Sequence, residues 1–173
     1  MESTLPVGEP APNFSLPDLD GKIHTLAGYR DLVVVLNFWS AECPWSQRAD
    51  ELIAPALARL GRGIVLLSIA SNANEMAEAL AYEAGRRQIS PVLLDLDQAV
   101  ADLYQAQATP HYFLIDRGGA LRFQGPPDDA TFRQREAGRD YLIPAVEAVL
   151  AGRTPGFQTV LPYGCAIVRF PLG

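Results

Sequence analysis

The chain has 173 residues, and its 14 basic and 20 acidic side chains give a formal net charge of −6. An apolar fraction of 49% is ordinary for a globular protein, and the length suffices for one domain with a full core. The acidic balance argues against nucleic acid and anionic membrane surfaces as partners, and no apolar run approaches the ~18 residues of a membrane span.

The N-terminal segment before Val33 begins as extended or loop chain, because prolines stand at positions 6, 10, 12 and 17. Phe14–Leu16 alternates and predicts a short edge strand. Asp18–Gly21 is typical of a turn, and Lys22–Leu26 predicts a second short strand. The segment lacks a signal-peptide pattern, so we expect a cytoplasmic protein.

An apolar, β-branched run, Val33–Phe38, predicts a strand that is buried on both faces. Cys43 follows where this pattern breaks, and Pro44 suits the first turn of a helix. Leu52, Ile53, Ala56, Leu57 and Leu60 then recur at helical spacing. Cys43 is therefore predicted at a helix N-terminus, where free N–H groups and the helix dipole lower a thiol pKa from ~8.5 to roughly 3.5–7.5. The alternative is a buried, inert cysteine.

Further strands and helices are predicted in alternation along the middle of the chain. The aspartates Asp95 and Asp97 stand between two of these elements, but no other ligand residues occur at useful spacing. We therefore expect Asp97 to cap a helix rather than a metal site to form. The predicted elements are a strand at Ile64–Ala70, a helix at Met76–Arg87 capped by Asn72 or Asn74, a strand at Pro91–Leu94 and a helix at Val100–Tyr104.

In the C-terminal half, Ala108–Asp116 predicts an apolar strand that contains Pro110, and Leu121–Phe123 pairs back on it after a glycine turn. His111 could serve as a base or pack within the strand, and packing is favoured. Tyr141–Ala151 predicts an amphipathic helix. Strands and helices in this order predict an α/β layer fold.

The segment from Asn37 to Ser46, Asn-Phe-Trp-Ser-Ala-Glu-Cys-Pro-Trp-Ser, resembles the active site of the thioredoxin superfamily. Among its branches, the segment is most similar to the TlpA-like and AhpC/TSA (redoxin) proteins. Thr109-Pro110 resembles the family segment whose cis proline faces the catalytic cysteine. The resemblance spans about residues 5–150. It implies a thioredoxin-like α/β fold over 1–173, with a mixed sheet flanked by helices, an N-terminal hairpin and a C-terminal extension at 153–173.

The resemblance also implies a thiol–disulfide oxidoreductase with Cys43 as nucleophile. Trp45 would be exposed beside the thiol, and Thr109 and Pro110 would bind an extended substrate chain. Protein or small-molecule disulfides and thiols are the expected substrates. We find no phosphate-binding or dinucleotide motif, and we expect no cofactor.

The chain departs from the family pattern at Ser46, which stands where the second cysteine belongs. A disulfide within the motif is therefore excluded, although the Ser46 hydroxyl could donate a hydrogen bond to the Cys43 thiolate. Two alternatives stay open. A peroxiredoxin-like peroxidase would use Ser40 beside the thiol, but Leu36 stands where that family has proline. A non-catalytic module would bind extended chains without using Cys43.

The other cysteine of the chain, Cys165, follows Gly164 in the C-terminal extension. It is either the partner that resolves a mixed disulfide on Cys43, or a small apolar residue in a strand or brace packed on the core. In the second case Ile167, Val168 and Phe170 would supply the packing. The residues alone leave both possibilities open.

Overall fold

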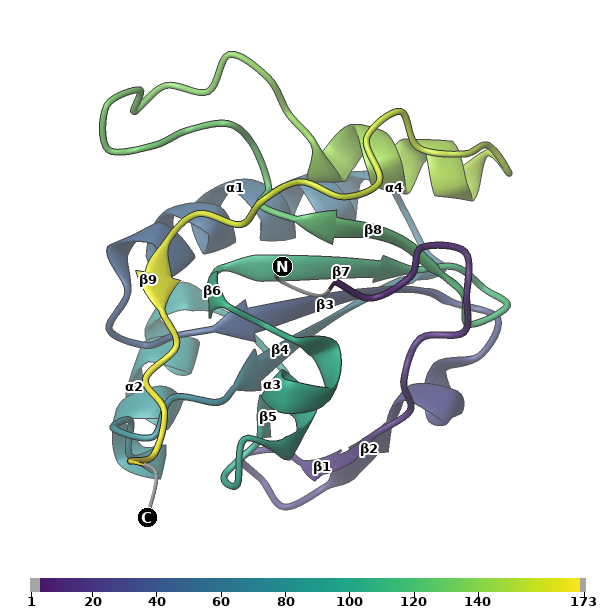
Figure 1. The fold of residues 1–173 in the computed structure, drawn as a ribbon. Coiled ribbons are helices and arrows are strands. Elements are labelled where there is room, and N and C mark those ends of the chain that lie inside the picture. The colour runs from purple at the N-terminus through teal and green to yellow at the C-terminus, as the bar shows by residue number, and fades with distance from the viewer. Residues whose placement is uncertain (1–3, 172–173) are drawn as a thin grey trace.

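The computed structural model describes residues 4–171, which are built on a five-stranded mixed sheet in the order β5-β4-β3-β7-β8 (Figure 1). The strands β3, β4 and β5 run parallel, whereas β7 and β8 join the other edge of β3 antiparallel. This arrangement confirms the predicted mixed sheet. The strands are β3 (Val33–Trp39), β4 (Ile64–Ala70), β5 (Val92–Leu94), β7 (His111–Ile115) and β8 (Leu121–Gly125).

Helices cover both faces of the sheet (Figure 1). One face carries α1 and α4, the other carries α3, and α2 lies toward the β4–β5 side. The N-terminal hairpin, β1 paired antiparallel with β2, lies on the α3 side, as the sequence predicts. The bounds are β1 (Ser15–Pro17), β2 (Ile23–Thr25), a short 3-10 helix (Leu26–Tyr29), α1 (Pro44–Arg59), α2 (Ala77–Arg87), α3 (Ala99–Tyr104) and α4 (Leu142–Leu150).

The central strand β3 is buried along its whole length, which confirms the prediction from its β-branched composition. Val33 and Val35 pack with α1 and α4. The intervening Val34 and Leu36 pack with α3 and the hairpin on the opposite face. Successive side chains of a strand point to opposite faces, so a continuous apolar run is required where helices cover both.

After α4 the chain returns across the end of the sheet as an extended tail, residues 153–171 (Figure 1). Its two-residue strand β9 (Cys165–Ala166) pairs antiparallel with β6 (Ala108–Thr109). The tail passes the N-terminal end of α1 and ends beside α2. The extension predicted at 153–173 is therefore seated against the rest of the molecule as far as it is described.

The predicted helix caps are wrong in detail. Helix α2 begins after Met76, and neither asparagine before it caps the helix. At α3 the N-cap position belongs to Gln98, and the buried Asp95 carboxylate accepts the N–H groups of Val100 and Ala101 at 3.1 and 2.9 Å. The side chain of Asp97 accepts the N–H of Ala99, the first residue of α3, at 3.1 Å, although Asp97 is not the N-cap residue. Sequence patterns place a cap by adjacency, whereas here a more distant carboxylate folds back over the first turn.

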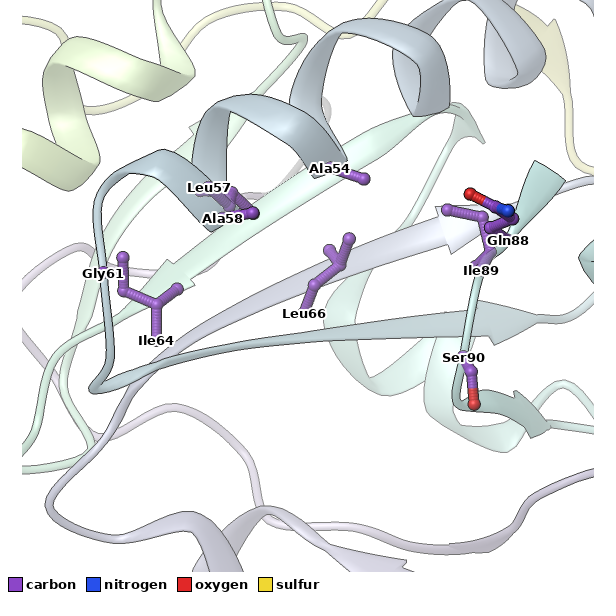
Figure 2. A pocket seen from close by; sticks show the side chains of 9 residues that line it. All are labelled: Ala54, Leu57, Ala58, Gly61, Ile64, Leu66, Gln88, Ile89 and Ser90. Carbon is purple, nitrogen blue, oxygen red and sulfur yellow. The ribbon is translucent and has the colours of Figure 1, made fainter.

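One pocket of about 240 Å³ lies between the C-terminal half of α1, the start of β4 and the segment 88–90 (Figure 2). Its lining is mostly apolar and contains neither cysteine. Among residues 4–171, no helix combines the length and apolar character that crossing a membrane requires.

Candidate active site around the Cys43–Cys165 disulfide

Cys43 occupies the N-cap of α1, directly after the loop that leaves β3. Its backbone is extended, Pro44 begins the helix, and the Cys43 carbonyl accepts the N–H of Gln47 at 3.0 Å. The cysteine is 3% exposed. These observations confirm the predicted position at a helix N-terminus, while the lowered thiol pKa stays a prediction.

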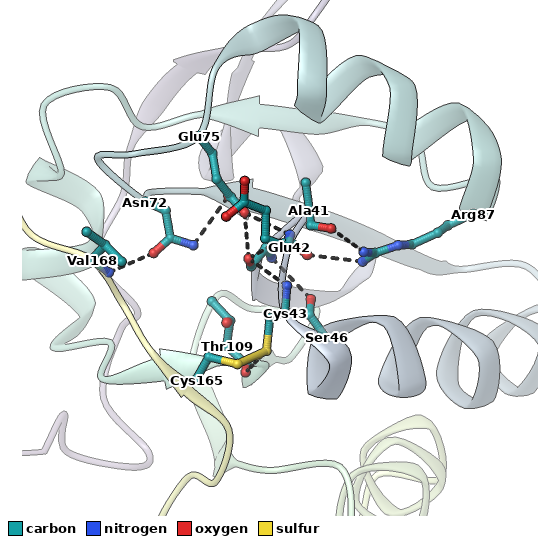
Figure 3. Close-up of a disulfide and its surroundings, with 11 residues drawn as sticks. Ala41, Glu42, Cys43, Ser46, Asn72, Glu75, Arg87, Thr109, Cys165 and Val168 are labelled. Carbon is teal, nitrogen blue, oxygen red and sulfur yellow. Dashed lines mark hydrogen bonds between the residues drawn. A yellow bond between two sulfur atoms is a disulfide. The ribbon is translucent and has the colours of Figure 1, made fainter.

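Cys43 forms a disulfide with Cys165, across 122 positions of sequence and 6.2 Å between Cα atoms (Figure 3). Of the two possibilities for Cys165, the pairing with Cys43 is therefore present. The packed brace holds only for Ile167, which is 7% exposed, whereas Val168 and Phe170 are 42% and 51% exposed.

The disulfide lies against the segment that contains the cis proline. The Thr109–Pro110 bond is cis, as predicted, and the Cys43 Sγ lies 3.2 Å from the Thr109 carbonyl oxygen. Thr109 is also the strand partner of Cys165. Any side chain at Gly164 would overlap that same carbonyl oxygen, so the tail approaches this closely only because residue 164 is glycine.

Trp45 differs from the expectation of an exposed ring beside the thiol. It is half-buried, and Tyr163 of the tail packs on it edge to face, with 5.1 Å between ring centroids. The Tyr163 hydroxyl in turn accepts the N–H of Phe132 at 2.9 Å. The path of the tail was not predicted from the sequence, and it is the tail that covers the indole.

Ser46 is fully buried, and its hydroxyl oxygen accepts the Ser40 N–H at 3.1 Å. It therefore ties the first turn of α1 to the loop after β3. The predicted hydrogen bond to a Cys43 thiolate stays a prediction, because the sulfur here is part of a disulfide.

Ser40 and Glu75 organise the backbone around Cys43 (Figure 3). The Ser40 hydroxyl donates to the Glu75 carboxylate at 2.6 Å and accepts the Cys43 N–H at 3.2 Å. The Glu42 N–H bonds the same carboxylate oxygen at 3.0 Å. Glu75 was missed by sequence reasoning, since it follows β4 and nothing in its local pattern points to Cys43.

A buried ion pair supports the loop that precedes Cys43. Arg87, at the end of α2, donates to the Ser40 carbonyl at 3.0 Å and to the Ala41 carbonyl, and pairs with Asp50 at 3.2 Å. Burial raises the pKa of the Asp50 carboxyl, against hydrogen bonds from Trp39 and Arg87 that lower it. The loop before Cys43 is thus held by a cation whose charge is balanced by Asp50 on α1 and by Glu83 on α2, the latter at 3.0 Å.

His111 is a buried, neutral imidazole. Burial lowers its pKa to about 3, and its Nδ1 accepts the Gln107 N–H at 3.3 Å. This agrees with the favoured packing role. In the part of the chain that the structure describes, His, Cys, Asp and Glu side chains nowhere gather in a group that could hold a metal ion.

Residues 7–124, more than half of the chain, match the AhpC/TSA family. The chain belongs to the AhpC/TSA family. This AhpC/TSA protein is 30% identical over 128 residues to the thiol-disulfide oxidoreductase ResA of Geobacillus thermodenitrificans, with 70% of each chain covered. The predicted membership of the redoxin branch is confirmed.

Solved structures share the fold. A hypothetical protein from Sinorhizobium meliloti is 33% identical with a TM-score of 0.84, and 95% of each chain is covered. The uncovered part is shorter than the tail, so the likeness extends into the tail. A putative thiol:disulfide interchange protein DsbE from Chlorobium tepidum, 24% identical with a TM-score of 0.63, covers 70% of this chain and 85% of its own and shows the fold alone. The family, the ResA relatives and the disulfide at Cys43 support the predicted oxidoreductase activity.

Proposed function

We propose that this protein is a thiol–disulfide oxidoreductase whose redox-active pair is Cys43 and Cys165. The observation that carries the proposal is the disulfide between a cysteine at a helix N-terminus and a cysteine on a strand that pairs beside the cis proline. Ser46 stands in place of the second cysteine of the usual motif, and the tail brings Cys165 to the Cys43 sulfur instead.

The chemistry is reversible exchange between two thiols and one disulfide. The Cys43 thiolate attacks one sulfur of a substrate disulfide, forms a mixed disulfide and releases the other sulfur as a thiolate. The Cys165 thiolate then attacks the Cys43 sulfur, and the second substrate thiolate leaves. Two electrons pass to the substrate, and the two protons given up by the cysteines end on its two sulfurs. An external dithiol reverses these steps and regenerates the protein.

In the oxidised state a pocket of about 170 Å³ opens on both cysteines. Glu42, Asn72 and Glu75 contribute polar groups to its lining and Ala166 and Val168 contribute apolar ones, so the pocket is small and mixed in character. Such a space suits the attacking sulfur of a thiol but not a folded domain. We propose thiols and disulfides carried on flexible chains or small molecules as the substrate class.

The peroxidase alternative receives less support from the site. A peroxiredoxin-like role would need the Ser40 hydroxyl to serve the Cys43 sulfur, yet that hydroxyl donates its hydrogen bond to Glu75. A binding module that leaves Cys43 unused fits less well too, because the disulfide engages that cysteine.

The proposal is tested with single-cysteine variants. Reduced wild-type protein should release two equivalents of thionitrobenzoate from Ellman's reagent and end as an intramolecular disulfide by mass. The Cys165→Ser variant should release one equivalent and retain the other on Cys43. In the insulin-reduction assay with dithiothreitol, Cys43→Ser should abolish catalysis. Wild-type turnover by Cys165→Ser would contradict the assigned pair, and no turnover by the wild type would contradict the activity.

A further inference from the structure

Beyond Cys165 the described tail is held by backbone hydrogen bonds together with the side chains of Ile167 and Arg169. The strand β9 has only two residues, too few to hold a chain segment alone. Past it, the N–H of Val168 donates to Asn72 Oδ1 at 2.7 Å, and its carbonyl accepts from Gln98 Nε2 at 2.7 Å and from the Ala73 N–H at 2.9 Å. The Phe170 N–H donates to Gln98 Oε1 at 3.1 Å. The side chains of Val168 and Phe170 are 42% and 51% exposed, so these two residues are held chiefly through their backbone. Arg169 between them adds side-chain contacts, to the Asp102 carboxylate at 2.6 Å and to the Ala106 carbonyl at 2.9 Å.

Gln98 has an unusual conformation for its place in the fold. A helix N-cap normally has extended backbone, but Gln98 has a φ of 62°, in the left-handed region that non-glycine residues rarely adopt. Gln98 is only 5% exposed, and this conformation places its side chain between the tail and the segment that follows β4. Its amide nitrogen donates to the Ser71 carbonyl at 2.6 Å as well as to Val168. A strained residue persists where its surroundings determine its position, and here those surroundings are the tail and the end of β4.

Asn72 links the tail to the backbone of Cys43 (Figure 3). Its Oδ1 accepts the Val168 N–H, and its Nδ2 donates to Glu75 Oε2 at 3.3 Å. Glu75 in turn accepts from Ser40, whose hydroxyl accepts the Cys43 N–H. A continuous chain of hydrogen bonds therefore joins the two cysteine-bearing segments without passing through the disulfide.

We propose that Asn72 and Gln98 form a latch that holds the tail in place when the disulfide is reduced, and so positions Cys165 to resolve the mixed disulfide on Cys43. The inference rests on the proposed function. Both are positioning residues, because they act on the tail and not on the sulfur. A latched tail keeps the Cys165 thiol at high effective concentration, and a free tail would lose much of it.

The test is the equilibrium between the Cys43–Cys165 dithiol and disulfide in glutathione buffers, read by acid quench, alkylation and mass. Gln98→Leu removes all three amide contacts, so the equilibrium constant for disulfide formation should fall at least about tenfold. Asn72→Ala should shift it in the same direction, and it carries the test if Gln98→Leu does not fold. Gln88→Leu is the matched control: Gln88 is also left-handed, and it lines the pocket of Figure 2, which contains no tail residue.

Amide hydrogen exchange in the reduced protein provides the second measurement. Val168 and Phe170 should be protected in the wild type and in Gln88→Leu, and should exchange faster in Gln98→Leu. Melting temperatures that fall equally in both redox states, with an unchanged equilibrium constant, would overturn the latch and leave a structural role. Failure of the wild type to form the disulfide in oxidised glutathione would instead contradict the proposed redox pair.

Discussion

Ser46 contributes a structural contact that its place in the motif does not suggest. Its hydroxyl oxygen accepts the Ser40 N–H inside the molecule. Replacing it with alanine leaves a buried donor without an acceptor, so Ser46→Ala should lower the free energy of unfolding by about 1–3 kcal/mol in urea titrations. Ser68→Ala is the matched control, because Ser68 is equally buried and its hydroxyl has no partner among the described residues. A loss as large in Ser68→Ala would contradict the argument.

At the level of single residues, the sequence predicts what depends on neighbours in the chain. The placement of Cys43 follows from the strand before it and Pro44 after it, and the cis bond at Pro110 follows from a family resemblance. Glu75 and Gln98 could not be predicted, because each acts on a segment that is distant in the sequence. Their signal is three-dimensional: a buried polar side chain whose partners lie on another loop.

The C-terminal end of α2 supports the active-site loop through Arg87. Arg87→Met would leave the Asp50 carboxylate buried and unpaired, and would free the carbonyls of Ser40 and Ala41. We expect a loss of about 3–5 kcal/mol in the free energy of unfolding at pH 7, measured by urea titration.

The pH dependence of this variant checks the cause. The pKa of Asp50 in the folded protein is already raised, and loss of the cation raises it further. A raised carboxyl pKa means that the folded state binds a proton the unfolded state has lost, so stability falls as pH rises above the unfolded value of ~3.9. The deficit of Arg87→Met should therefore shrink as the pH is lowered from 7 toward 5. An equal deficit at both values would show that the lost carbonyl contacts, not the unpaired charge, dominate.

The order of strands and helices was predictable because the apolar periodicity is strong. The predicted strand at Ile64–Ala70 matches β4 to the residue, and the predicted helix ends lie within a few residues of the observed ones. The caps were not predictable, since the Asp95 carboxylate replaces the expected Asp97 at α3 by folding back over its first turn. The side chain that caps a helix is decided by its position in three dimensions, which adjacency in the sequence does not fix.

The disulfide closes a loop that contains most of the molecule. For a separation of 122 residues, the chain-entropy treatment gives about 5 kcal/mol of stabilisation, which corresponds to a rise of about 10–20 °C in melting temperature. Oxidised wild-type protein should melt higher than reduced protein by this order in scanning calorimetry. In Cys165→Ser the difference between redox conditions should vanish. An unchanged melting temperature on reduction would mean that the reduced chain keeps its loop closed by other contacts.

For the whole molecule, the sequence predicts the thioredoxin-like layers but leaves the pairing of Cys165 undecided. The tail follows a path set by backbone bonds to Asn72, Ala73 and Gln98, and no periodic pattern encodes such bonds. Within the described tail the apolar signal of a packed segment is sparse: Ile167 joins one core cluster, and Val160 packs partly buried against the other. The sequence therefore leaves the pairing of Cys165 undecided because that pairing depends on contacts between side chains and a distant backbone.

The pairing of β9 with β6 has a consequence for access to Thr109. Cys165 is the strand partner of Thr109, so the tail occupies the edge at which an extended substrate chain would otherwise add a strand. Because the proposed latch keeps the tail there in the reduced protein as well, we expect a substrate to reach the Cys43 sulfur without pairing its backbone at Thr109. Recognition would then depend on the thiol or disulfide that the substrate carries and not on the sequence of an extended chain.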